Sequence, residues 1–239
     1  MPQSIPIEGE VTSITHSATE FIVLSNTSSS SYLTHLQYDL RSNQQSLTAF
    51  YRSVFSYQDS LVLCGKMLCV QQNHRTVYSC RLPSEGWCVT GNDKGVMIGC
   101  QRGEIVWYNW KKQIRVVCRM KTGIKECDHW GDQFAICDLE GNFCLFLVCS
   151  YEDMVMTEIC TEIHTALSLS CCEEGVILGC KQGRIAVDWN GVIVDQENCQ
   201  AISVIRYSSP ILCGVSDSAV WVRPQRGYSI QQKAIYCVC

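Results

Sequence analysis

The chain has 239 residues, of which 46% are hydrophobic and 18% are charged. This balance excludes an intrinsically disordered or collagen-like protein, because enough apolar surface is available to build a sizeable core. The formal net charge is -4. It argues against a protein that binds nucleic acid by charge alone, since that mode of binding needs a strongly basic surface.

The first ten residues lack the basic and apolar segments of a secretory signal, and no apolar run is long enough to span a membrane. We therefore expect an intracellular protein that is cytoplasmic, nuclear or both. The longest apolar run, Phe143–Cys149, has the length of a strand.

Eighteen cysteines are present, and many of them lie inside or beside apolar runs, as at Cys64, Cys137 and Cys180. A free thiol in such a run behaves as a small hydrophobic side chain. No C-x-x-C pair occurs, so the spacing of structural zinc sites is absent. We expect reduced core thiols, with no metal and no cofactor; disulfides and a metal site are the alternatives.

An apolar segment recurs along the chain at intervals of about 40 residues. Val96–Ile105 reads VMIGCQRGEI and Val176–Ile185 reads VILGCKQGRI, so the apolar positions, two glycines and a cysteine coincide. Phe134–Phe143 repeats the same order of apolar run, turn and second apolar run. With three weaker copies, the recurring segments start near residues 21, 61, 96, 134, 176 and 211.

The third unit shows most clearly how each repeat divides into four short strands. We expect these strands at Trp87–Thr90, Val96–Gly99, Glu104–Tyr108 and Ile114–Cys118. β-Branched and aromatic residues fill the runs, whereas Gly, Asn and Asp fill the gaps between them. Helical spacing is not sustained over any window, so the sequence predicts an all-β fold.

A single four-stranded sheet of about 40 residues would leave two apolar faces uncovered, and stacking such sheets around an axis covers both. We therefore predict one β-propeller domain over residues 1–239, with about six four-stranded blades running from near Val11 to near Tyr236. Residues 1–10 are a candidate ring-closing segment, in which Ser4–Ile7 would pair beside the final blade. Rings of five or seven blades, and an incomplete ring finished by a partner subunit, are the alternatives.

The segment Cys88–Trp110 resembles a WD40-type blade, in which a strand, a polar turn, an apolar strand, a Gly turn and a strand with an aromatic end follow one another. Leu167–Trp189 and Ile202–Val222 are similar. No Gly-His pair opens a repeat and no Trp-Asp pair closes one, so the resemblance is to a divergent WD40-like propeller. It implies a non-catalytic scaffold that holds other protein subunits or peptides in a multi-protein complex.

In that family one rim of the ring is formed by the turns between the second and third strands and by the connections between blades. The resemblance places on this rim the Ser-rich turn Asn26–Ser31 and the predicted partner-binding residues Gln101, Arg102, Glu104, Lys181, Gln182, Arg184 and Asp217. Arg102 and Arg184 are the first candidates, since arginine side chains often anchor interfaces. Hairpin turns also favour polar residues without any partner.

Support for catalysis is sparse, and we predict no catalytic residues. The densest local group of reactive side chains is Glu126–Trp130, with sequence ECDHW. On a strand, Cys127 and His129 would share one face and Asp128 would point to the other. A polar strand with its loop is the favoured interpretation; an enzyme or small-ligand binder that uses the central channel is the alternative.

A second alternative is binding of RNA by a basic group on the outer strand of the third unit. The basic side chains are Lys111, Lys112, Arg115 and Arg119. They are interleaved with Trp107, Trp110 and Trp130, and Arg together with aromatic faces suits single strands. A solvated outer edge explains the same residues more simply.

Overall fold

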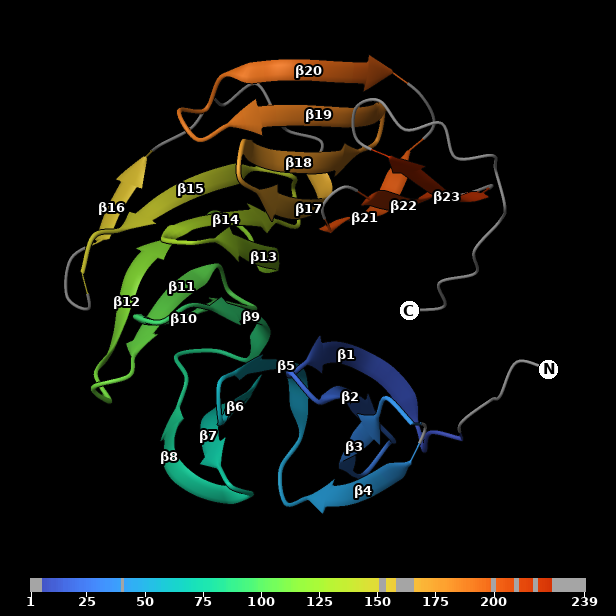
Figure 1. Cartoon of the computed structure of the whole chain (residues 1–239). Helices are drawn as coiled ribbons and strands as arrows, with labels where there is room; N and C mark the ends of the chain where they lie inside the picture. The colour runs from blue at the N-terminus through green and yellow to red at the C-terminus, as the bar shows by residue number, and fades with distance from the viewer. Residues whose placement is uncertain are drawn as a thin grey trace.

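The computed structural model describes residues 6–39, 41–150, 154–157, 166–198, 201–208, 211–216 and 219–224. All regular secondary structure in this part of the chain is β-strand, which confirms the all-β prediction (Figure 1). None of the described segments forms a helix that could cross a membrane.

Six antiparallel sheets follow one another along the chain, and each is a meander of consecutive strands. The first sheet comprises β1 (Glu10–His16), β2 (Glu20–Asn26), β3 (Ser31–Gln37) and β4 (Ser42–Leu47). The second comprises β5 (Tyr51–Tyr57), β6 (Ser60–Gly65), β7 (Met67–Gln72) and β8 (Arg75–Arg81). The third comprises β9 (Gly86–Gly91), β10 (Gly95–Cys100), β11 (Glu104–Asn109) and β12 (Ile114–Arg119).

The later sheets repeat the same plan. The fourth comprises β13 (Ile124–Trp130), β14 (Gln133–Asp138), β15 (Phe143–Val148) and β16 (Met154–Thr157). The fifth comprises β17 (Ala166–Cys172), β18 (Gly175–Cys180), β19 (Gly183–Asp188) and β20 (Ile193–Asn198). The sixth comprises β21 (Ile202–Ser208), β22 (Ile211–Ser216) and β23 (Ala219–Pro224).

Each recurring apolar segment of the sequence forms the second strand of a sheet, from β2 to β22. In the third unit the four expected strands match β9 to β12 to within one residue at each end. The agreement follows from burial: β10 and β11 are buried along their whole length. A strand that is covered on both faces is apolar at successive positions and therefore easy to recognise in a sequence.

The six sheets stand side by side in an arc, with the first strand of each toward its inside and the fourth strands outside (Figure 1). The inner strands β1, β5, β9, β13, β17 and β21 pack against one another in that order. No pairing among the described strands joins the last sheet to the first. At the free end of the arc, Val11 and Ile14 of β1 are 36% and 49% exposed.

The predicted closure of the ring involves residues that the structure describes only in part. Pro6 and Ile7 are not in a strand, while residues 1–5 lie outside the described residues. The predicted end of the last unit near Tyr236 also lies outside them. Closure by residues 1–10 therefore stays a prediction.

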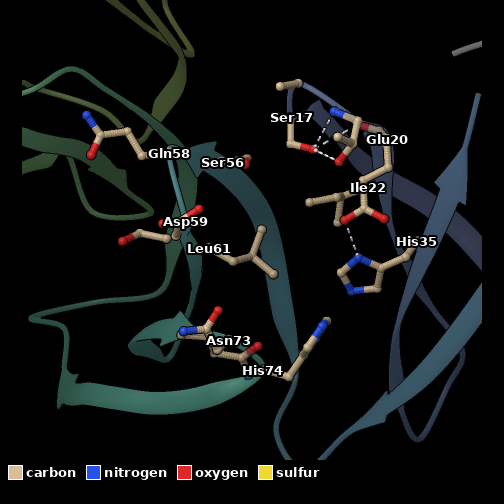
Figure 2. Close-up of a pocket in the computed structure, with 14 residues that line it drawn as sticks. Ser17, Glu20, Ile22, His35, Ser56, Gln58, Asp59, Leu61, Asn73 and His74 are labelled. Carbon is tan, nitrogen blue, oxygen red and sulfur yellow. Dashed lines mark hydrogen bonds and ion pairs between the residues drawn. The ribbon is translucent and has the colours of Figure 1, made fainter.

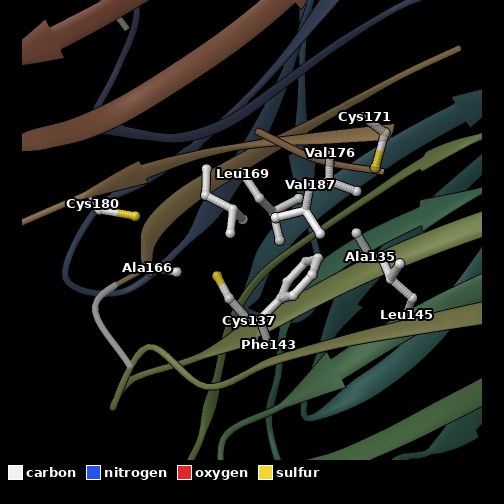
Figure 3. Close-up of a cluster of buried hydrophobic side chains, with 11 residues drawn as sticks. Ala135, Cys137, Phe143, Leu145, Ala166, Leu169, Cys171, Val176, Cys180 and Val187 are labelled. Atoms are coloured by element: carbon white, nitrogen blue, oxygen red, sulfur yellow. The ribbon is translucent and has the colours of Figure 1, made fainter. Parts of the chain in front are cut away.

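The core is divided among the five contacts between successive sheets, which we call seams one to five. Each of the five clusters of buried side chains draws its members from two neighbouring sheets. In seam four, for example, Cys137 and Phe143 of the fourth sheet meet Ala166, Leu169 and Val187 of the fifth (Figure 3). Neighbouring sheets therefore bury each other's apolar faces, as the propeller prediction requires.

Side-chain size is balanced across four of the five seams, at the point where the second strand of one sheet meets the first residue of the next. Seam three places Gly99 beneath Ile124, and seam five places Gly179 beneath Ile202. Where the second strand carries a cysteine instead, the first residue of the next sheet is small. Cys64 meets Gly86 in seam two, and Cys137 meets Ala166 in seam four. Seam one differs, because both Leu24 and Tyr51 are large.

Candidate interaction surface

The turns between second and third strands and the connections between sheets lie at the same end of the strands, and we call this end the turn face. The register of the first sheet shows why: Asn26, at the end of β2, pairs with Glu10 and with Ser31. Ser31 in turn pairs with Leu47, the last residue before the connection to the next sheet.

Backbone hydrogen bonds tie the turns of this face to the connections between sheets. Leu82 N donates to Lys66 O at 3.2 Å and Gln101 N donates to Glu85 O at 2.7 Å. Further along, Met120 N donates to Gly103 O at 2.9 Å, and Leu139 N donates to Gly123 O at 2.9 Å. The turn face is therefore a continuous, hydrogen-bonded backbone surface across the second to fourth sheets.

Four of the predicted partner-binding residues are exposed on the turn face. Gln101 and Arg102 lie in the β10–β11 turn, and Lys181 and Gln182 lie in the equivalent β18–β19 turn. The Arg102 side chain makes no hydrogen bond or ion pair with another described residue. Asp217 lies outside the described residues.

Glu104 is not accessible at this surface, which corrects its placement there. It is 3% exposed, accepts a 2.6 Å hydrogen bond from Ser84 Oγ and forms an ion pair with Arg119. Burial alone would raise the pKa of Glu104, but the hydrogen bonds from Ser84 and Arg119 outweigh it and hold that pKa below its ordinary value. Glu104 therefore links β11 and β12 of the third sheet to the connection that precedes β9.

Arg184 is also engaged within its own sheet. Its side chain is 17% exposed and its guanidinium lies 2.5 Å from an Asp195 carboxylate oxygen and 3.7 Å from one of Glu197. Both acidic residues belong to β20, the outer strand. Of the two arginines that sequence reasoning singled out, Arg102 is the one presented to solvent.

Two apolar residues of the turn face were missed by sequence reasoning. Leu139 is 57% exposed in the β14–β15 turn, and Trp87 at the start of β9 is partly exposed. Both lie beside Gly123: Leu139 N donates to Gly123 O at 2.9 Å, and a Cβ at Gly123 would lie 3.2 Å from Trp87 Cζ3 and 2.4 Å from Gln101 O. We call Trp87, Gln101, Arg102 and Leu139 the turn-face patch. The sequence did contain a signal for Leu139, because it is the apolar residue of an otherwise polar turn, residues 139–142 with sequence LEGN.

The Glu126–Trp130 segment holds neighbouring sheets together. Glu126 Oε2 accepts a 2.9 Å hydrogen bond from Leu169 N, and Asp128 Oδ2 accepts one of 2.8 Å from Cys171 N. These backbone amides belong to β17, whose strand edge would otherwise leave them unpaired inside the arc. The carboxylates thus satisfy the inner edge of the next sheet.

Cys127 and His129 share the opposite face of β13, as predicted, and point to the third sheet. His129 Nδ1 lies 2.8 Å from Thr90 Oγ1. A hydrogen bond with Cys88, together with burial, raises the pKa of Cys127 well above its ordinary value, while burial lowers the pKa of His129 to about 4. A nucleophilic cysteine needs a lowered thiol pKa, whereas that of Cys127 is raised. The surroundings of Cys127 and His129 are therefore those of residues that pack between two sheets.

Thirteen cysteines whose side chains the structure describes are free thiols, and nine of these thirteen are buried. Burial raises the pKa of Cys100 to about 12 and that of Cys64 well above its ordinary value. Such thiols stay protonated and unreactive while the fold is intact. Within the same part of the chain, no three His, Cys, Asp or Glu side chains converge as they would around a metal ion.

The basic group on the third sheet is exposed, but most of its aromatic companions are not available. Lys111 and Lys112 lie in the β11–β12 turn, and Arg115 and Arg119 lie on β12. Trp107 is 1% exposed, and Trp110 stacks on Tyr57 at a centroid distance of 5.9 Å. Trp130, at the end of β13, is 44% exposed. Stacking of nucleic-acid bases needs accessible aromatic faces, so one of the three tryptophans meets this requirement of the RNA-binding alternative.

Comparison with solved structures finds several with a similar fold. The chain aligns with the computationally designed protein Ika8 at a TM-score of 0.75 and 12% identity, over 92% of this chain and 72% of that one. BamB from Moraxella catarrhalis gives 0.61 and 11%, over 95% and 75% of the two chains. Hsv2 from Kluyvelomyces marxianus gives 0.66 and 10%, over 94% and 75%.

BamB and Hsv2 are β-propeller proteins. No known family model matches the chain, and a search of curated proteins found no match either. At these identities the likeness concerns the fold, which is an all-β, propeller-like arrangement of antiparallel sheets.

Proposed function

We propose that this protein is a non-catalytic interaction scaffold, a WD40-like propeller that holds protein partners on its turn face within a multi-protein complex. The observation that carries the proposal is the turn-face patch. It combines an exposed leucine, a partly exposed tryptophan and an unpaired arginine on a hydrogen-bonded backbone.

The composition and the rigidity of the patch both favour binding of protein. Trp and Arg are the residues that most often contribute large binding energies at interfaces. Because backbone hydrogen bonds already order the turns, less conformational entropy is lost when a partner docks. Gln101 and Arg102, together with Lys181 and Gln182 two sheets away, would provide the polar rim.

The six sheets support a propeller of six blades in a single domain. The exposed β1 side chains Val11 and Ile14 lie where a further strand or a partner would complete the ring. Closure by residues 1–10 remains our preferred arrangement, and an intracellular location remains a prediction. The catalytic and RNA-binding alternatives have less structural support. Glu126 and Asp128 accept hydrogen bonds from the next sheet, and Trp107 is buried.

The proposal is tested by purifying the tagged full-length chain from its native cells and quantifying bound proteins by mass spectrometry. The variant Arg102→Glu/Leu139→Glu places two negative charges on the turn-face patch. Asp93→Lys is the matched control, because Asp93 is exposed in the β9–β10 turn, at the opposite end of the strands. We expect the partners bound by the wild type to be lost from the double variant and kept by the control.

The same proteins recovered at the same ratios with all three chains would contradict the proposal. A chain that elutes without any stoichiometric partner would do so as well. Equal thermal unfolding temperatures of the three purified chains are required for the comparison, since both turn-face substitutions are at exposed positions and should leave the fold intact.

A further inference from the structure

A pocket of about 300 Å³ lies between the first and second sheets, at the end of the strands opposite the turn face (Figure 2). The β1–β2 turn, β2 and β3 form one wall, and the β5–β6 and β7–β8 turns with the adjoining strands form the other. The fourteen residues that line it include Glu20 and Asp59 but no Lys or Arg. The pocket therefore carries negative charge at the mouth of seam one.

One wall holds a histidine whose second ring nitrogen is buried without a partner. His35 lies directly across from Ile22 in the first sheet, and Glu20 is on the same face two residues earlier. His35 Nδ1 lies 2.9 Å from Glu20 Oε1. A carboxylate can only accept, so Nδ1 carries the proton of this contact, and in the uncharged tautomer Nε2 has the free lone pair. Nε2 is buried and receives no hydrogen bond from any described residue.

The other wall brings a second histidine to the same place by means of a strained turn. Gln72 pairs with Arg75, so Asn73 and His74 form a two-residue hairpin loop with φ of 49° and 61°. Such a loop strongly favours glycine at its second position. His74 occupies that position instead, and its ring lies 5.3 Å from that of His35, edge to face.

Backbone strain is concentrated around this pocket. Four non-glycine residues in the described part of the chain have positive φ, and three of them, Gln58, Asn73 and His74, line the pocket. Strained conformations of this kind persist where the surrounding structure holds them, and they gather at ligand sites. The strained position of His74 places its side chain at the pocket, where it can contact a ligand.

The chemistry of the walls defines the ligand. A buried acceptor lone pair on His35 calls for a group that donates a hydrogen bond. The carboxylates of Glu20 and Asp59 favour a cation, and Asp59 makes no hydrogen bond or ion pair with another described residue. A guanidinium group offers five N–H donors in one plane and stacks on aromatic rings.

We propose that the pocket between the first and second sheets binds a guanidinium cation, with His35 Nε2 and the carboxylates of Glu20 and Asp59 as acceptors and the His74 ring as a stacking partner. The cation would come from an arginine side chain of a peptide or from a free guanidinium compound. The proposal concerns this pocket alone and does not depend on the scaffold function, which uses the opposite face.

The test uses the full chain with isotope-labelled histidine and follows the imidazole signals by NMR. Three probes are titrated: agmatine, the peptide acetyl-Gly-Arg-Gly-amide, and the same peptide with citrulline, which has the shape of arginine without its charge. We expect saturable shifts of the His35 and His74 signals with agmatine or the arginine peptide, and at least about tenfold weaker binding of the citrulline peptide. Binding of agmatine alone would identify a free compound as the source.

Two variants separate the site from the fold. Glu20→Gln should weaken binding by about tenfold, because it removes the charge and keeps the shape. His74→Gly should weaken binding while the thermal unfolding temperature stays equal or rises, since glycine relieves the strained turn. No shift of either imidazole at about 10 mM probe, equal binding of the citrulline peptide, or full binding by both variants would overturn the proposal.

Discussion

Seams two and three solve the same packing problem with opposite assignments of side-chain size. In seam two the second strand contributes Cys64 and the next sheet begins with Gly86; in seam three the second strand contributes Gly99 and the next sheet begins with Ile124. In both seams a glycine on one sheet leaves room for a larger side chain on the other. The repeats can therefore diverge in sequence at these two seams, because either sheet can supply the larger side chain.

Seams one and four make equivalent hydrogen bonds between sheets with different acceptor groups. In seam one, Ser13 Oγ accepts from Val54 N at 3.1 Å and Thr15 Oγ1 accepts from Ser56 N at 3.2 Å. In seam four, the carboxylates of Glu126 and Asp128 do the same at the same spacing of two residues. Alternate residues of a strand share a face, so geometry sets the spacing while the acceptor group is free to vary.

The largest effect is expected from exchanging the packing of seam three for that of seam two. A Cβ at position 99 would lie 2.2 Å from Ile124 Cγ2 and 2.6 Å from Cys88 Sγ. Gly99→Cys should therefore lower the free energy of unfolding by about 3 kcal/mol, and urea denaturation measures it. Gly86→Ala in seam two should lower it less, because a Cβ there would lie 2.9 Å from Leu82 Cδ1, the end of a flexible side chain, and 3.1 Å from Cys64 Cβ.

A second substitution checks whether the cost arises at that contact. Ile124→Ala alone leaves a cavity and should also destabilise the protein, by roughly 3 kcal/mol. Combined with Gly99→Cys, it makes room for the new side chain, so the double variant should lose less than the sum of the two single losses. Additive losses would show that the two residues do not compensate each other.

An intermediate effect is expected from the inter-sheet acceptors. Asp128→Ala leaves the Cys171 amide without its charged acceptor and should lower the free energy of unfolding by about 2 kcal/mol, whereas Ser13→Ala should lower it by about 1 kcal/mol. Chemical denaturation of both variants at neutral pH gives the comparison. Equal losses for the two would mean that charge adds nothing to this contact.

An effect about as large as that of Asp128→Ala concerns the response of seam three to pH. The pKa of His129 is lowered by burial from 6.5 to about 4. The unfolded chain therefore takes up a proton between these values while the folded chain does not, so stability is full above pH 6.5 and declines as the pH falls toward 4. The loss from this group should be on the order of 2 kcal/mol.

The control for this pH effect is His129→Gln, which removes the titrating group. Unfolding free energies at pH 7 and pH 4.5 should differ more in the wild type than in the variant. Parallel declines would assign the acid sensitivity to other residues.

Sequence reasoning reached the strands because their signal is local. The apolar runs of β10 and β18 are separated by turns rich in Gly, Asn and Asp, and each run is buried on both faces. It placed the exposed turn at Gln101 and Arg102 for the same reason. It misplaced Glu104, since the burial of that carboxylate depends on Ser84 and Arg119, which are 20 and 15 residues away.

The pocket of seam one was likewise invisible in the sequence. His35 and His74 are isolated among 239 residues and belong to different sheets. Nothing in their local patterns indicates that their rings meet, because the contact follows from how the first two sheets stack. The unpaired nitrogen of His35 becomes evident only when every neighbouring donor has been located.

The amino-acid sequence by itself determined the repeating strands, the all-β class and the apolar faces, because these follow from the alternation of side chains along a short segment. The tertiary structure alone decided which residue faces which across a seam, which carboxylates are buried and where the two histidines meet. Such pairings depend on the distance and register between sheets, which are set by the packing of both partners together.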